Sequence, residues 1–62
     1  MRIDRIKLVT ELKRRDMTQT QLASLSGVSR ATINNIVAGK SCSETVAKKL
    51  ADVFKIDISK LI

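Results

Sequence analysis

Several residue types are scarce or missing in this 62-residue chain, and each absence excludes a class of protein. There is no histidine, tryptophan, tyrosine or proline, and Cys42 is the only cysteine. A single cysteine cannot close a disulfide within the chain, and without histidine beside it a zinc site is not expected. Because a secreted domain this small usually needs such cross-links, we expect the chain to work in a reducing cytoplasm.

The composition offers few of the residues that enzymes use for catalysis. No histidine is available as a general base, and the two glycines, Gly27 and Gly39, do not make a phosphate-binding loop. A serine–lysine pair is an arrangement that composition alone leaves open. We therefore expect a binding module rather than an enzyme, with no metal, no cofactor and no small-molecule ligand.

Long hydrophobic runs are also missing. The longest covers residues 36–38, whereas a membrane-spanning helix needs about 20 apolar residues, so we expect no membrane partner. The hydrophobic content of 44% is nonetheless ordinary for a folded chain. Twelve Lys and Arg against six Asp and Glu give a net charge of +6, which favours an acidic partner such as nucleic acid.

The apolar residues recur at helical spacings, and the length allows one domain over residues 1–62. The first helix is expected over residues 5–15, with Asp4 as its N-cap. Three cations in its last turn are expected to complement the helix dipole and solubilise the chain, or to contact DNA: Lys13, Arg14 and Arg15. Its expected buried face consists of Ile6, Val9 and Leu12, with Leu8 beside them.

Two short helices follow. A Ser/Thr-to-Gln capping pattern starting at Thr18 predicts a second helix over residues 19–26, and a third is expected over residues 30–38. Glycines mark both ends, because each can adopt the left-handed conformation that stops a helix. The expected caps and stops are Thr18, Gly27, Ser29 and Gly39.

The fourth helix has two possible starts, a capping box from Ser41 to Glu44 or a cap at Ser43. Ser43 is preferred, because Val46, Leu50, Val53 and Phe54 then share one face. A last short turn is expected after Asp57. The chain is therefore predicted to be all-α, a compact domain of five helices. We expect most of a further apolar set in its core: Leu25, Phe54, Ile58, Leu61 and Ile62. Those within the last six residues could equally pack on a second subunit.

The second and third helices with their short glycine-containing turn make a helix-turn-helix pattern. A corner between two helices needs the same spacing, so the spacing alone establishes only geometry. However, no acidic residue lies between Met17 and Ser43, and the only charges there are Arg30 and Lys40. A surface that approaches phosphates cannot tolerate uncompensated carboxylates, so this segment favours DNA.

The outward face of the third helix carries side chains suited to base edges. Arginine matches guanine, asparagine matches adenine, and alanine or a threonine methyl matches the thymine methyl. Each of these residues also has a simpler interpretation as a solvated surface group. The candidate base-reading residues are Arg30, Ala31, Thr32, Asn34 and Asn35.

Several segments together resemble the Cro/CI (XRE) helix-turn-helix family, which includes the Cro and repressor DNA-binding domains of lambdoid phages. They are residues 17–23, 27–29, 39–40 and 50–51, with Ile33. The resemblance implies a lambda-repressor-like domain of five helices whose third helix enters the major groove. It implies that Gln19 and the first amides of the second helix hold a phosphate. The candidate DNA-backbone residues are Thr18, Gln19, Ser29 and Lys40.

Three features depart from the family pattern. Leu12 and Val37 occupy positions where many members carry a buried Arg–Glu pair, and we expect these two apolar side chains to touch. Ser26 stands at a usually apolar place and Leu25 at a usually polar one, which leaves two orientations of the second helix open. Residues 41–45 lack the basic side chains that some relatives direct to DNA, so minor-groove reading is not supported.

The sequence therefore predicts a sequence-specific double-stranded DNA-binding regulator, most simply a repressor that blocks a promoter. One recognition helix contacts too few bases to be selective, so we expect a homodimer on an inverted repeat, with half-sites about 34 Å apart. The resemblance implies a bacterial or phage-encoded protein that acts on the nucleoid. Two alternatives stay open: a component of a toxin–antitoxin or restriction-control system, and a protein-interaction module with the same fold.

Overall fold

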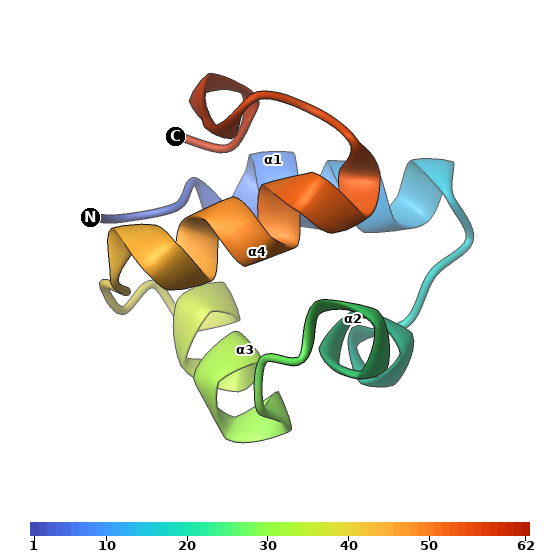
Figure 1. Cartoon of the computed structure of the whole chain (residues 1–62), viewed down its shortest axis with the longest axis horizontal. Helices are drawn as coiled ribbons and strands as arrows, with labels where there is room; N and C mark the ends of the chain where they lie inside the picture. The colour runs from blue at the N-terminus through green and yellow to red at the C-terminus, as the bar shows by residue number, and fades with distance from the viewer.

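Four α-helices and one 3₁₀ turn make up the chain (Figure 1). The computed structural model describes all of residues 1–62. The elements are α1 (Arg5–Arg14), α2 (Gln19–Ser26), α3 (Arg30–Val37), α4 (Glu44–Phe54) and the turn η1 (Ile58–Lys60). The all-α prediction is confirmed. The prediction of five helices is not, because the last element is a single turn closed by hydrogen bonds from Lys60 to Asp57 and from Leu61 to Ile58, both 2.9 Å.

The helix boundaries follow their capping residues. The Oδ1 of Asp4 accepts from the backbone N–H of Ile6 at 2.8 Å, and the Oγ of Ser43 accepts from that of Val46 at 3.2 Å. Ser43 is therefore the cap of α4, as preferred from the sequence. Both α1 and α3 end one residue before the predicted position, because the next residue serves as the C-cap in each case.

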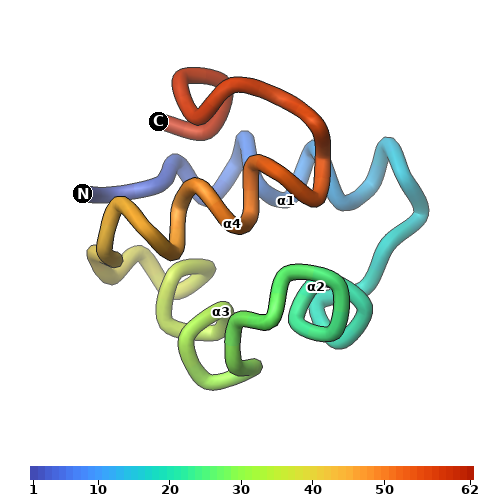
Figure 2. The backbone as a smooth tube through the Cα atoms, in the orientation of Figure 1, coloured from blue at the N-terminus to red at the C-terminus, as the bar shows by residue number.

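The core draws on every helix and on both ends of the chain. Its twelve buried apolar residues are Ile3, Leu8, Leu12, Leu22, Val28, Ile33, Ile36, Ala47, Leu50, Ala51, Phe54 and Leu61. Helix α3 contacts both α1 and α2, and α2 also packs against α4. Figure 2 shows α2 and α3 together on one side of α4, so that the helix-turn-helix forms one edge of the molecule.

The buried face of α1 differs from the predicted one. Leu8, Glu11 and Leu12 are buried, whereas Ile6 is 71% exposed. Each residue turns a helix by about 100°, so Ile6 lies about 160° around the axis from Leu8. Placing Ile6 on the buried face was therefore wrong, and the carboxylate-bearing Glu11 takes the place beside Leu12.

The orientation of α2 is the reverse of what hydrophobicity alone predicts for Leu25 and Ser26. Leu25 is 65% exposed, so its expected place in the core was wrong, and Ser26 is half-buried instead. Ser26 lies one turn after the buried Leu22 and therefore shares its face. Burial of Ser26 costs little because its hydroxyl donates to the carbonyl of Leu22 at 2.7 Å. Leu12 is buried and Val37 half-buried against the same core, and their direct contact stays a prediction.

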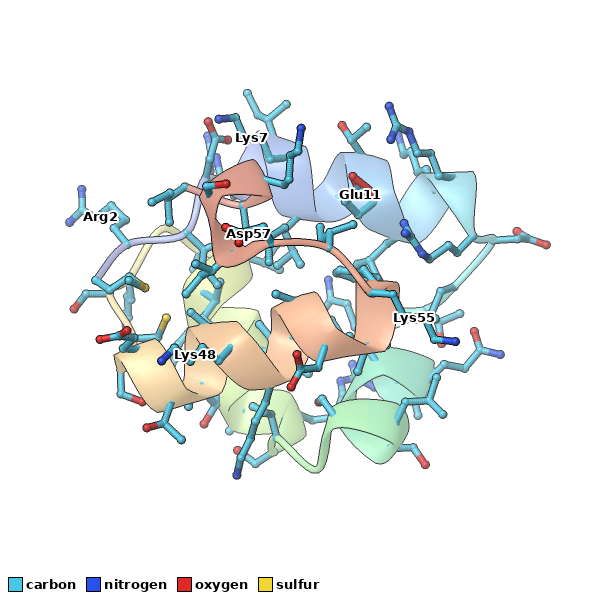
Figure 3. The ribbon with its side chains drawn as sticks, turned by 45° about the horizontal axis from the view of Figure 1, so that its top comes forward. Arg2, Lys7, Glu11, Lys48, Lys55 and Asp57 are labelled. Carbon is cyan, nitrogen blue, oxygen red and sulfur yellow. The ribbon has the colours of Figure 1, made fainter.

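The two ends of the chain are tied together. The backbone N–H of Asp4 donates to the carbonyl of Leu61 at 2.7 Å, and Nζ of Lys7 donates to the carbonyl of Ile62 at 2.6 Å. Figure 3 shows Lys7 beside the C-terminal turn that contains Asp57. Ile3, which no periodic pattern indicated, is only 2% exposed at this junction.

Asp57 provides a test by pH. Its carboxylate accepts from the backbone N–H of Ser59 at 2.9 Å, and this bond holds the pKa of Asp57 below its ordinary value. Because the folded-state pKa is the lower one, the cap stabilises the fold above the unfolded pKa, and the effect is lost as pH falls through the folded pKa. We expect Asp57→Ala to lower the urea midpoint at pH 7, and the difference from wild type to shrink below about pH 4. Asp52→Ala is the control, and a difference that persists unchanged at pH 2 would contradict the capping role.

Candidate nucleic-acid interface

A sharp three-residue turn, residues 27–29, joins α2 to α3. Gly27 has φ of 74°, in the left-handed region that side chains disfavour, and its N–H donates to the carbonyl of Ala23 at 3.0 Å. Val28 is buried at 6% exposure, and its N–H donates to Oγ of Ser26 at 3.2 Å. The turn is thus fixed by backbone conformation, by packing and by a side-chain hydrogen bond.

The N-terminus of α2 carries the predicted capping box. The N–H of Gln21 donates to Oγ1 of Thr18 at 3.1 Å, and the N–H of Thr18 donates to Oε1 of Gln21 at 2.8 Å. The backbone amides of Gln19 and Thr20 donate to no acceptor in the chain. Two free amides at the positive end of a helix are suited to an anion, including a DNA phosphate.

The outward face of α3 brings together most of the predicted base-reading side chains. Arg30, Ala31, Asn34 and Asn35 are exposed, whereas Ile33 and Ile36 are buried on the opposite side. Figure 1 shows α3 at the edge of the molecule, with no other helix beyond it. This face therefore has the exposure that a groove-binding helix requires.

Thr32 and Ser29 are engaged with each other at the start of α3. Ser29 accepts from the N–H of Thr32 at 3.2 Å, and its hydroxyl donates to Oγ1 of Thr32 at 2.8 Å. Thr32 is half-buried, at the flank of the outward face. Ser29, like Thr18, is thus first a helix cap, and its contact with a DNA phosphate stays a prediction.

The charge around this edge has one sign. Between Met17 and Ser43 the only charged residues are Arg30 and Lys40, and both are exposed. Lys40 follows Gly39, whose φ of 95° turns the chain after α3. The acidic side chains with ion-pair partners, Glu11 and Glu44, belong to α1 and α4. No carboxylate in this segment would oppose a phosphate backbone.

One contact of Arg30 was missed from the sequence. Its Nη1 donates a hydrogen bond to the hydroxyl of Thr20, which lies on α2 ten residues earlier. Thr20 belongs to no capping pattern, and nothing in its local sequence signals a partner on another helix. The bond links the first turn of α2 to the first residue of α3.

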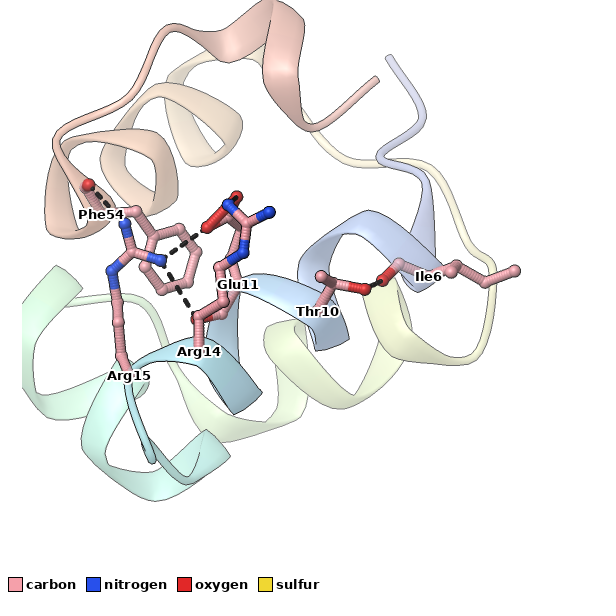
Figure 4. A network of polar contacts seen from close by, with 6 residues as sticks. All are labelled: Ile6, Thr10, Glu11, Arg14, Arg15 and Phe54. Carbon is pink, nitrogen blue, oxygen red and sulfur yellow. Dashed lines mark hydrogen bonds and ion pairs between the residues drawn. The ribbon is translucent and has the colours of Figure 1, made fainter.

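Arg15 was expected to complement the dipole of its own helix and solubilise the chain, or to contact DNA, and the structure shows it engaged within the protein (Figure 4). Its Nη1 donates to the carbonyl of Glu11 in the last turn of α1 at 3.1 Å, as a cation that complements this helix end would. Its Nη1 donates to Oε2 of the buried Glu11 at 2.6 Å, and its Nη2 donates to the carbonyl of Phe54 at 2.9 Å. The guanidinium also lies 4.8 Å from the centre of the Phe54 ring. Arg15 therefore caps the C-terminus of α4.

Two further features of the sequence concern Cys42 and the carboxylates. Cys42 is half-buried, and burial raises the pKa of its thiol, which disfavours the reactive thiolate. No three His, Cys, Asp or Glu side chains come together in a group that could hold a metal ion. None of the helices is both long enough and apolar enough to cross a membrane.

Comparison with known proteins agrees with this geometry. Residues 9–61 match the profile of the helix-turn-helix family of the XRE type, whose members include Cro/CI-like domains. The match indicates a DNA-binding regulator of this type. None of the curated proteins matches the chain.

A solved structure of a hydroxyethylphosphonate dioxygenase point mutant contains a similar fold. The TM-score is 0.87 with 27% sequence identity, over 100% of this chain. This chain spans 14% of the length of the dioxygenase chain, so the likeness concerns one small part of that protein.

Proposed function

We propose that this chain, which belongs to the XRE-type helix-turn-helix family of Cro/CI-like domains, is a sequence-specific regulator that binds double-stranded DNA. Its proposed role is repression by occupying a promoter. The observation that supports this best is the outward face of α3, where Arg30, Asn34 and Asn35 are exposed together within a segment free of carboxylates. In this proposal residues 1–62 act as one domain in a bacterial cytoplasm, on a bacterial or phage operator.

The base-reading roles follow from the chemistry of each side chain. Arg30 offers forked donors to O6 and N7 of guanine, and Asn35 offers a donor and an acceptor to adenine. Ala31 and the methyl group of Thr32 suit a thymine methyl. Asn34 shares the exposed face with Arg30. These contacts would lie near the N-terminal end of α3, where helices of this motif meet base edges.

Contacts with phosphates would fix the position of α3 along the DNA. The free amides of Gln19 and Thr20 lie at the start of α2, and Lys40 extends from the turn after α3. Thr18 and Ser29 would add their hydroxyls while they cap their helices. Each phosphate contact raises affinity without reading sequence, so these residues would set affinity and salt dependence.

Selection of random duplex DNA on the purified protein at about 150 mM salt tests the function, because at this salt weak phosphate contacts alone bind poorly. We expect enrichment of an inverted repeat with half-sites about one helical turn apart. A folded protein that enriches no sequence would overturn the proposal.

The C-terminal end is the proposed dimer contact, since the α2–α3 edge is committed to DNA. Ile62 is 49% exposed and follows the buried Leu61. We expect Ile62→Ser to weaken operator binding about tenfold or more, by loss of the apolar contact between copies. Leu25→Ser on α2 is a matched control, because Leu25 is 65% exposed and lies beside α4 and the end of α1, away from the C-terminal turn. Equal operator affinity of the Ile62 variant and wild type would argue against this interface.

A second candidate is a protein-interaction module, either alone or within a toxin–antitoxin or restriction-control system. A similar fold also forms part of the dioxygenase chain, so the fold alone does not distinguish a DNA-binding domain from an interaction module. Salt separates the two functions. DNA binding through six or more phosphates would weaken by roughly a thousandfold between 50 and 200 mM salt, whereas an apolar protein contact would change little.

A further inference from the structure

Thr20 lies on α2, outside the face of α3 that carries the base-reading side chains. Its hydroxyl nevertheless accepts a hydrogen bond from Nη1 of Arg30. Both residues are exposed, so packing of the core does not impose this contact. The bond crosses the turn between the helices and ties the end of a long, flexible side chain to the first turn of α2.

No other group of the protein competes for this guanidinium. The ion pairs of the structure involve Arg14, Arg15 and Lys48, and none involves Arg30. Arg30 is also the only charged residue between Thr18 and Gly39. The hydroxyl of Thr20 is therefore the one hydrogen-bond partner that the guanidinium of Arg30 has in the chain.

We propose that Thr20 is a positioning residue, which holds the guanidinium of Arg30 in the orientation that selects its base pair. The inference rests on the proposed DNA-binding function. A guanidinium has five N–H donors, and the bond to Thr20 uses one, so a fork remains for O6 and N7 of guanine. Because the side chain is already oriented, less of its rotamer freedom is lost when it meets the base.

The hydroxyl of Thr20 could instead contact a phosphate directly, next to the backbone amide of Thr20 that the proposed function already places there. The two roles predict different measurements. A phosphate contact carries no sequence information, and its loss weakens binding uniformly and flattens the salt dependence. A positioning role acts through Arg30, and its loss alters the preference at one base pair.

The test uses the full chain and the operator enriched from random duplex DNA. Dissociation constants are measured for the operator and for variants at each single base pair, with Thr20→Ala, Thr20→Ser and Ser24→Ala. Ser24 is an exposed residue of α2 and serves as the matched control. Arg30→Ala and the Arg30→Ala/Thr20→Ala double variant complete a cycle.

We expect Thr20→Ala to reduce discrimination at the base pair read by Arg30 about three- to tenfold, a part of the roughly ten- to hundredfold that a forked arginine–guanine contact supplies. Thr20→Ser, which keeps the hydroxyl, restores it. In the Arg30→Ala background the Thr20 substitution has no further effect. A uniform loss of affinity with unchanged base preference, or an effect that persists without Arg30, overturns the positioning role. If wild type enriches no DNA sequence, it is the proposed function that fails.

Discussion

Replacing Arg30 by alanine is expected to remove about 1–3 kcal/mol of binding free energy per half-site and to relax specificity at one base pair. Arg30 is exposed at the first position of α3 and is the only cation on that helix. Its side chain makes no ion pair within the protein, so removing it strands no partner charge. The thermal unfolding of the variant should therefore match that of wild type.

The measurement is a set of dissociation constants for the operator and its single-base variants. Lys49→Ala is the control, because it removes an equal charge from an exposed position on α4. Loss of a solvated charge should weaken all sequences slightly and equally. Wild-type affinity and wild-type base preference in the Arg30 variant would show that α3 does not read DNA through this residue.

Replacing Arg15 by alanine is expected to lower the free energy of unfolding by about 2–3 kcal/mol. The carboxylate of Glu11 is only 11% exposed and relies on Arg15, which binds it at 2.6 Å. Loss of Arg15 would leave this carboxylate nearly buried, with only a weaker contact of 3.4 Å to Arg14. It would also leave the carbonyl of Phe54, the last residue of α4, without the hydrogen bond from Arg15.

Urea unfolding of two comparison variants separates these causes. Arg14→Ala should cost much less, because the Arg14 side chain is 70% exposed. The Glu11→Met/Arg15→Met double variant should recover most of the loss, since it removes the buried charge together with its partner. Equal stability of the Arg15→Ala variant and wild type would show that Glu11 is solvated well enough without its partner.

Local signals in the sequence predicted the helices and the exposed face of α3. Caps such as Thr18, Ser29 and Ser43 act within three residues of themselves, so their patterns can be recognised without knowledge of the fold. The left-handed Gly27 is equally local. The faces of α1 and α2 depend on which neighbours they meet, and there Ile6 and Leu25 were misplaced.

The contacts that were missed join different helices. Arg15 binds the carbonyl of Phe54, 39 residues away, and Thr20 binds Arg30 on another helix. From the sequence, both arginines were interpreted as ordinary surface charges or as DNA contacts. Leu12 and Val37 replace the ion pair expected from the resemblance. The part-buried ion pair of this chain joins Glu11 on α1 to Arg15, which also reaches the end of α4.

The tie between the two chain ends implies an order of docking during folding. Asp4 meets Leu61 across almost the whole length of the chain, and joining such distant segments carries a larger loop-closure entropy than forming a local turn. These ends should dock after the helices have packed and fray first when the protein opens. Neither terminal segment is hydrogen-bonded to residues 19–38. Fraying would therefore break none of the hydrogen bonds of the α2–α3 edge, and in the proposed dimer a second copy in contact with Ile62 would oppose the fraying.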